Sequence, residues 1–337
     1  MIFITAILKE EKKMLKTIPH RSFHPFGVMV RKEVSDQVNS WRFLILVVII
    51  GLTCLSAMYT SLSEMRNAVK PGDPAGTFFF LKIFTLSNGT LPAFFVFISF
   101  LGPLLGIGLG FDAINSEQSR GTLSRILSQP VHRDDILNAK FVASLKVIGI
   151  LFFSLGFLVM GFGMVSLGKP PTPEEFLRII SFVLLSIVYV AFWLNLSILF
   201  SVWFKQPATS ALAGIAVWLF FSVFYPMIVQ LIVRALTPWG TTLNSVAAFR
   251  LTELKISLMR ISPSYLFSEA TTTLLMPSIR TLGPLTYWQT VGAIPSPLSL
   301  GQSLLLIWPQ VTGLIAATVL GFALAYVSFM KREVRSR

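Results

Sequence analysis

The sequence predicts an all-α membrane protein with six transmembrane helices. Hydrophobic residues make up 54% of its 337 residues and charged residues only 13%, whereas soluble globular domains carry about 25% charged residues. Six apolar runs are long enough to cross a bilayer, because a helix of roughly 20 residues spans the ~30 Å hydrocarbon layer. The net charge of +13 gathers beside these runs, which favours a membrane protein over a soluble nucleic-acid-binding protein.

The residues before the first apolar run divide into an arm and an amphipathic helix. We expect residues 1–25 to form a poorly ordered N-terminal arm. Within 26–42, Val30, Val34, Val38 and Trp41 recur at helical spacing, while polar residues fill the opposite face. This pattern predicts an interfacial amphipathic helix, and a helix packed on a soluble partner is the alternative.

The predicted transmembrane domain extends from residue 43 to residue 330. Its six crossings are expected at 43–60, 88–110, 141–167, 176–204, 208–236 and 302–330. Lysine and arginine mark the cytoplasmic side of a membrane protein, and they gather in the N-terminal residues, in the segment 111–140 and in the tail 331–337. The sequence therefore predicts a multi-pass protein of the cell (plasma) membrane with both termini in the cytoplasm.

The second crossing carries a strip of small residues. Gly102, Gly106 and Gly110 repeat at every fourth position, so the backbone of another helix can approach this face closely. We predict a helix-packing surface there, either within the chain or between subunits. Pro92 and Pro103 predict kinks in the same crossing.

The segment 111–140 contains its own helix signals. Glu117 and Arg120 are spaced to pair at i, i+3, and Gly121 permits a sharp change of direction. Thr122 is a candidate cap for a short helix at 123–129. This short helix has an apolar edge of Leu123, Ile126 and Leu127, and Pro130 ends it.

Two further elements follow from cap signals. Asp134 is expected to cap the third crossing, and Glu174 and Glu175 are expected in the first turn of the fourth.

The outer segment 237–301 predicts two outer-face helices, at 243–261 and 262–275. A seventh crossing there is disfavoured, because Glu269 and several threonines would have to enter lipid.

The sequence offers little for catalysis or ion coupling. The three histidines, His20, His24 and His132, lie outside the crossings, and the sequence contains no HExxH, GxSxG or GxxxxGK[ST]. It therefore predicts no catalytic residue, no metal site and no ATP-binding P-loop in this chain. The scarcity of ionisable residues within the crossings disfavours an ion-coupled carrier.

The polar segment resembles a known family. Glu117-x3-Gly121-Thr122-Leu123, then Pro130-Val131-x-Arg133 and Lys140, is similar to the cytosolic coupling segment of permease subunits of type 2 ATP-binding cassette (ABC) transporters. The stretch Arg31-Lys32-Glu33-Val34 leading into Trp41-Arg42-Phe43 resembles that family's elbow helix. The likeness covers about residues 26–330. It departs at Ser124 and Arg125, where family members often carry an acidic residue.

The resemblance implies a transmembrane subunit of an ATP-driven transporter, in a mostly exporting class. Two permease chains, here expected to be a homodimer, would flank the translocation path, and separate ATPase subunits carrying ATP and Mg would grip the coupling helix. The implied ATPase-coupling residues are Glu117, Arg120, Gly121, Thr122, Leu123, Ile126, Leu127, Pro130 and Arg133. The alternatives are a non-transporting membrane scaffold that recruits a cytosolic partner, or an ion-coupled secondary carrier.

Overall fold

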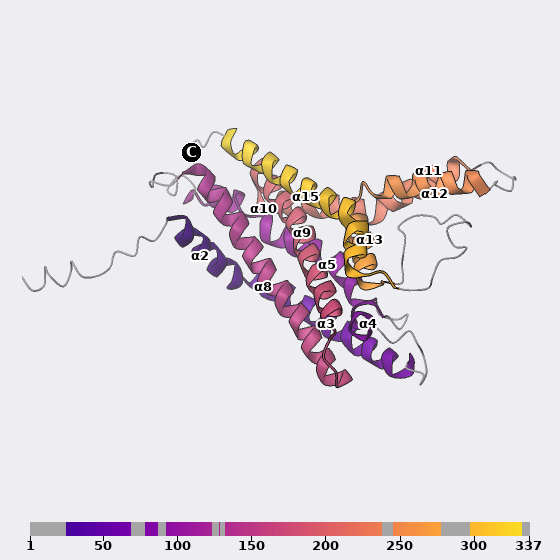
Figure 1. The fold of residues 1–337 in the computed structure, drawn as a ribbon. Helices are drawn as coiled ribbons and strands as arrows, with labels where there is room; N and C mark the ends of the chain where they lie inside the picture. The colour runs from indigo at the N-terminus through magenta and orange to yellow at the C-terminus, as the bar shows by residue number, and fades with distance from the viewer. Residues whose placement is uncertain are drawn as a thin grey trace, which may run out of the picture.

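The computed structural model describes residues 25–68, 78–86, 92–122, 128, 132–237, 245–277 and 297–331. The described part is helical, and six helices or helix pairs are long and apolar enough to cross a membrane. The predicted arm 1–25 lies outside the described residues except for Pro25, and the predicted tail except for Lys331. Figure 1 shows the C-terminal end of α15 at the same end of the bundle as α2.

The helices follow the predicted order with shifted bounds. They are α2 (Pro25–Val38), α3 (Trp41–Ala68), α4 (Phe79–Thr85), α5 (Phe94–Gly110), α6 (Asn115–Ser119), α8 (Arg133–Leu167), α9 (Pro173–Trp203), α10 (Pro207–Leu219), the π-helix η1 (Phe220–Phe224), α11 (Tyr225–Ala235), α12 (Ser245–Met259), α13 (Pro263–Leu275) and α15 (Leu300–Lys331). We call the end of the bundle with α2 and α6 the α2–α6 end, and the opposite end the α4–α13 end.

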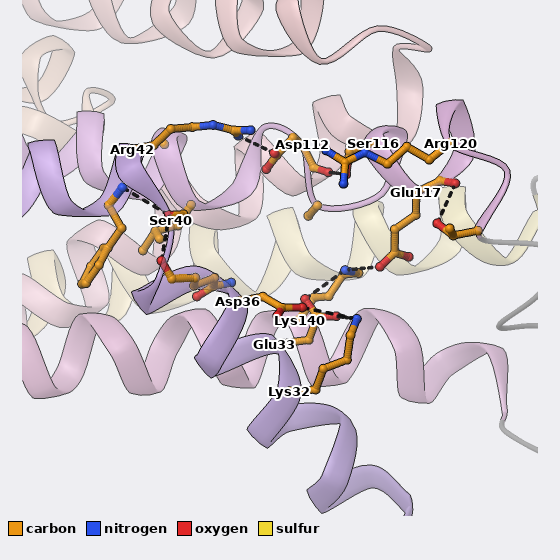
Figure 2. Close-up of a pocket in the computed structure, with 16 residues that line it drawn as sticks. Lys32, Glu33, Asp36, Ser40, Arg42, Asp112, Ser116, Glu117, Arg120 and Lys140 are labelled. Atoms are coloured by element: carbon orange, nitrogen blue, oxygen red, sulfur yellow. Dashed lines mark hydrogen bonds and ion pairs between the residues drawn. The ribbon is translucent and has the colours of Figure 1, made fainter.

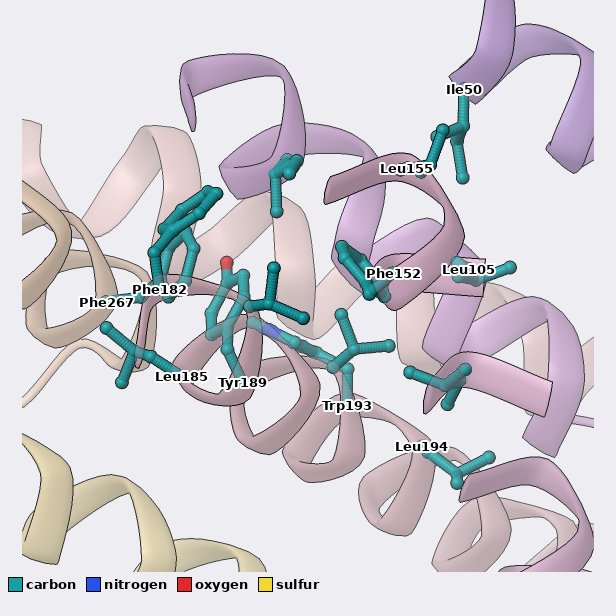
Figure 3. Close-up of a cluster of buried hydrophobic side chains, with 14 of the residues drawn as sticks. Ile50, Leu105, Phe152, Leu155, Phe182, Leu185, Tyr189, Trp193, Leu194 and Phe267 are labelled. Carbon is teal, nitrogen blue, oxygen red and sulfur yellow. The ribbon is translucent and has the colours of Figure 1, made fainter. Parts of the chain in front are cut away.

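Helix α9 is the centre of the bundle. It packs against α5, α8, α13 and α15, and Phe182, Tyr189 and Trp193 along it are fully or almost fully buried. Figure 3 shows these aromatic side chains directed into the core. The Tyr189 ring stacks on Phe267 of α13 with 4.3 Å between ring centroids, so the core joins α9 to α13.

The glycine strip of α5 lies against α9 of the same chain. A Cβ atom placed on Gly106 would meet the Val190 carbonyl oxygen at 2.7 Å, and one on Gly110 would meet the Leu194 carbonyl oxygen at 2.8 Å. A Cβ on Gly102 would reach the Val190 side chain at 3.0 Å. Because backbone atoms cannot move aside as side chains can, only glycine allows the two helices to approach this closely.

Helix α2 is shorter than predicted and packs along α8. Val30 is buried against Ala139 and Ala143, whereas Val38 is exposed. The predicted helix was to reach residue 42, but α2 ends at Val38 and α3 begins at Trp41. The reason is Ser40, whose hydroxyl accepts a hydrogen bond from the Phe43 N–H and donates one to the Gln37 carbonyl. Ser40 therefore acts as the N-cap of α3.

Two predicted starts of crossings were wrong. The second crossing begins at Phe94 rather than near residue 88, so Pro92 precedes the helix and only Pro103 lies within it. The third begins at Arg133, with Asp134 and Asp135 in its first turn and His132 at the N-cap position without a side-chain cap. Asp134 therefore does not cap this helix, although its charge still matches the helix dipole.

The fourth crossing begins as the sequence predicted. Glu174 and Glu175 lie in the first turn of α9, and Thr172 and Glu175 form a capping box. The Glu175 carboxylate also accepts the Phe80 N–H at 2.9 Å. That bond holds the first turn of α4, a short helix that the sequence analysis missed.

The segment 237–301 contains the two predicted helices, and their outer-face location stays a prediction. Helix α12 runs antiparallel to α11, and this pair extends away from the bundle in Figure 1, while α13 packs on α9 and α15. Ser262 is at the N-cap position of α13 but makes no side-chain cap bond. The π-helix η1 directly precedes α11, where Pro226 lies in the first turn. A π segment beside proline is a common local adjustment, because proline lacks an N–H and crowds the preceding turn.

Arg178 closes the α4–α13 end. Its side chain is 0% exposed and pairs with Glu174 at 2.9 Å. It also donates hydrogen bonds to the carbonyls of Leu274 and Leu298 and to the Ser303 hydroxyl. These partners tie α9 to the end of α13 and the start of α15.

Candidate functional site at the α2–α6 end

The chain turns sharply after α6, as the sequence predicted. Gly121 has a φ of +70°, a left-handed conformation that glycine adopts far more easily than other residues. The Thr122 hydroxyl donates a hydrogen bond back to the Glu117 carbonyl at 3.2 Å. The helix that Thr122 was expected to cap, at 123–129, lies outside the described residues except for Ser128.

Helix α6 is tied to the core at its first turn. The Ser201 hydroxyl of α9 accepts hydrogen bonds from the backbone N–H groups of Ile114 and Asn115, at 2.9 and 3.2 Å. Both of these residues are fully buried. The first N–H groups of a helix have no hydrogen-bond acceptor within the helix. The Ser201 hydroxyl supplies this acceptor and so holds the start of α6 against α9.

A buried lysine joins three elements at this end. The Lys140 ammonium of α8 lies 3.0 Å from a Glu33 carboxylate oxygen of α2 and 2.8 Å from one of Glu117 in α6. Its side chain is only 8% exposed. We call these three residues the Lys140 bridge. Figure 2 shows Glu117 turned toward Lys140 and away from the Arg120 guanidinium, so the predicted Glu117–Arg120 pair was wrong.

The bridge shifts the titration of Glu33. Burial alone would raise the pKa of this carboxyl, but the positive charges and hydrogen bonds of Lys140 and Lys32 outweigh it, so its pKa lies below the ordinary value. Glu33 is therefore held as a carboxylate. Gln37, one turn further along α2, donates a hydrogen bond to the Ser144 hydroxyl of α8 at 2.7 Å, which adds a second polar tie between these helices.

A cavity of about 510 Å³ lies between α2, α3, α5, α6 and the start of α8. Figure 2 shows the charged side chains around it. Arg42 at the start of α3 pairs across it with Asp112. Its charged lining residues are Lys32, Glu33, Asp36, Arg42, Asp112, Glu117, Arg120 and Lys140. We call this space the α2–α6 cavity.

The structure brings together some of the predicted coupling residues and leaves others apart. Glu117, Arg120 and Thr122 line the cavity beside Gly121, whereas the Arg133 guanidinium lies 5.6 Å from the Phe329 ring centroid of α15. Four predicted residues lie outside the described part of the chain, namely Leu123, Ile126, Leu127 and Pro130.

Sequence reasoning missed Glu33 as a member of the site. Its partner Lys140 stands 107 positions away in the sequence, and no local pattern reports such a pairing. The sequence did carry a signal at Lys140, which lies beside an apolar run. A lysine that becomes buried there needs an anionic partner. Among described residues, no group of three or more His, Cys, Asp or Glu is placed to hold a metal.

Comparisons with known proteins match most of this chain. A sequence-family model described as "ABC-2 family transporter protein" matches residues 28–334, from the first turn of α2 to beyond the end of α15. The "Probable ABC transporter permease protein NosY" of Stutzerimonas stutzeri is 29% identical over 247 residues, an alignment that covers 67% of this chain and 80% of that protein.

Proposed function

The chain belongs to the ABC-2 family of transporter proteins, and we propose that it couples ATP hydrolysis on separate ATPase subunits to transport, through the connection between α6 and α8. It is a multi-pass transmembrane subunit of an ABC transporter. The ATPase subunits would carry ATP and Mg, and this chain would supply the membrane path. Export is the direction we propose, on the resemblance of the coupling segment to a mostly exporting class.

The Lys140 bridge is the observation that carries this proposal. A coupling segment must pass a displacement to the transmembrane helices. A force on the chain after Gly121 reaches α8 directly through the backbone and reaches α2 through Glu117, Lys140 and Glu33. Helix α6 is in turn held to α9 by Ser201. A displacement of the connection between α6 and α8 would therefore be transmitted to α2, α8 and α9 together.

The orientation we propose places the α2–α6 end in the cytoplasm with both termini. The lysine and arginine residues of the N-terminal part and the tail support it, and α2 and the end of α15 lie at this same end. We propose a homodimer on the resemblance to type 2 permease subunits, which implies two permease chains around the translocation path.

The first test is association with an ATPase. The chain would be purified in mild detergent after co-expression with a neighbouring-gene ATPase subunit. We expect a stable complex whose ATP hydrolysis is retained through size-exclusion chromatography. Recovery of an unrelated cytosolic protein, with no ATPase bound under any nucleotide condition, would instead favour the scaffold alternative.

The second test strains the turn at Gly121. A Cβ added there meets no atom within 4 Å, so Gly121→Ala acts through backbone strain alone, about 1–2 kcal/mol for a left-handed residue. We expect ATPase binding to weaken about tenfold if that strain reshapes the coupling segment. Gly161→Ala is the matched control, because Gly161 also has open space but lies in regular helix. Equal binding by both variants would contradict the proposed contact.

A further inference from the structure

The α2–α6 cavity has the composition of a ligand site that the transport function does not require. Its volume of about 510 Å³ falls within the roughly 300–1,000 Å³ of small-molecule sites. We propose that it binds the headgroup of phosphatidylethanolamine, a phosphate joined to a primary ammonium, taken from the adjacent membrane leaflet.

The first argument is charge balance. The lining holds as many basic side chains as acidic ones. A ligand with only negative charge would meet Glu33, Asp36, Asp112 and Glu117 as well as the cations, and like charges at short distance are unfavourable. A zwitterion places each of its charges beside the opposite sign, so the cavity favours a zwitterionic headgroup over an anionic one.

The second argument identifies a place for the phosphate. Lys32, Arg42 and Lys140 are each within ion-pair distance of a carboxylate, whereas no ion pair joins Arg120 to any residue that the structure describes. Arginine binds phosphate oxygens with parallel hydrogen bonds. Arg120, at the rim of the cavity, is therefore the cation left to receive a phosphate.

The third argument identifies a place for the ammonium. The Gln37 Oε1 and Glu117 Oε2 atoms are buried and have no hydrogen-bond partner among described residues, and both residues line the cavity. Both atoms are acceptors only, so a ligand that satisfies them must donate hydrogen bonds. A primary ammonium carries three N–H donors, whereas the quaternary ammonium of phosphatidylcholine carries none.

The fourth argument concerns the acyl chains. Phe43, Gly108 and Leu109 form an apolar part of the lining, and they lie on helices that continue into the bilayer. Along α3, directly after Phe43, Leu44, Ile45 and Val48 are about half exposed. A headgroup in the cavity would thus have apolar surface for its chains on the adjoining helix.

The test is native mass spectrometry of the purified chain with a headgroup series. Phosphatidylethanolamine, its N-monomethyl and N,N-dimethyl forms and phosphatidylcholine keep the phosphate and the positive charge but lose N–H donors one by one. We expect the bound fraction to fall along this series, with binding at least about tenfold weaker for phosphatidylcholine. Equal retention of phosphatidylcholine, or stronger retention of phosphatidylglycerol, would overturn the proposal.

A variant locates the site. Arg120→Gln should lower phosphatidylethanolamine binding about tenfold, because a charge-assisted contact to phosphate is lost. Arg31→Gln is the matched control, since Arg31 is an exposed arginine of α2 that does not line the cavity. If the two variants retain the lipid equally, the headgroup does not bind at Arg120. An unchanged thermal unfolding midpoint would verify that both variants are folded.

A competition arm identifies the source of the headgroup. Soluble glycerophosphoethanolamine has the same phosphate and ammonium without acyl chains. We expect it to displace the lipid only at large molar excess, because the apolar contacts are absent. Displacement at equimolar concentration would overturn the lipid as the ligand. These measurements need no ATPase, so their failure leaves the coupling proposal untouched, and failure of the coupling proposal leaves this one standing.

Discussion

The two ends of the bundle each bury a basic side chain, but they hold it differently. At the α4–α13 end, Arg178 is fully enclosed, and two of its acceptors are the backbone carbonyls of Leu274 and Leu298. At the α2–α6 end, the ion-pair partners of the Lys140 ammonium among the described residues are the side-chain carboxylates of Glu33 and Glu117. The two carbonyls that accept from Arg178 belong to the backbone and cannot rotate away. The two carboxylates that pair with Lys140 are side chains of α2 and α6, beside a cavity.

This contrast separates an anchor from a movable contact. Leu274 lies in the last turn of α13, where carbonyls lack partners within the helix, so Arg178 completes that helix end as well as joining three elements. The carboxylates of the Lys140 bridge can instead separate from Lys140 by side-chain rotation alone. We therefore expect rearrangement to begin at the α2–α6 end while the α4–α13 end keeps the helices together.

The largest expected effect is at the anchor. Arg178→Met would leave the Leu274 and Leu298 carbonyls, the Ser303 hydroxyl and the Glu174 carboxylate without their donor. Each buried acceptor left unsatisfied costs about 1–3 kcal/mol, and several are lost together here. We expect a strongly lowered thermal unfolding midpoint in detergent. Arg234→Met is the control, because Arg234 is an exposed arginine of α11. Similar midpoints for the two variants would contradict the role of Arg178 as an anchor.

A smaller effect is expected at the movable contact. Lys140→Met leaves Glu33 and Glu117 facing each other without a cation, but these carboxylates can turn toward the cavity, so we expect a loss of about 1–3 kcal/mol. Lys146→Met, an exposed lysine on the same helix, should have little effect. Adding Glu33→Gln to Lys140→Met should recover part of the unfolding midpoint. A loss that equals that of Arg178→Met would remove the distinction between the two ends.

The smallest effect is a pH dependence confined to one end. The pKa of Glu33 is lower in the folded protein than its ordinary value of 4.5, so its stabilising contribution is complete above that value and is lost as pH falls through the folded pKa. Hydrogen exchange of α2, corrected for intrinsic rates, should therefore accelerate below about pH 4.5, relative to α13. Glu33→Gln should abolish this difference, and an equal acceleration of α13 would show a global cause.

Much of the fold was predictable because it depends on local composition. The six crossings lie where apolar runs of membrane length predicted them, and α12 and α13 form where the sequence predicted two helices. The predicted turn at Gly121 was also correct, since a left-handed residue is a local preference of glycine. Helix α8 begins earlier than predicted because polar residues continue a helix once tertiary contacts cover it. Helix α5 begins later than predicted, after Pro92.

The sequence by itself determined that this chain crosses a membrane six times, because hydrophobic length and charge are properties of each segment taken alone. Only the tertiary structure decided that the glycine strip of α5 meets α9, that Lys140 takes Glu33 and Glu117 as partners, and that a charge-balanced cavity opens beside them. Such contacts depend on distances in space between segments far apart along the chain, and a one-dimensional pattern does not contain those distances.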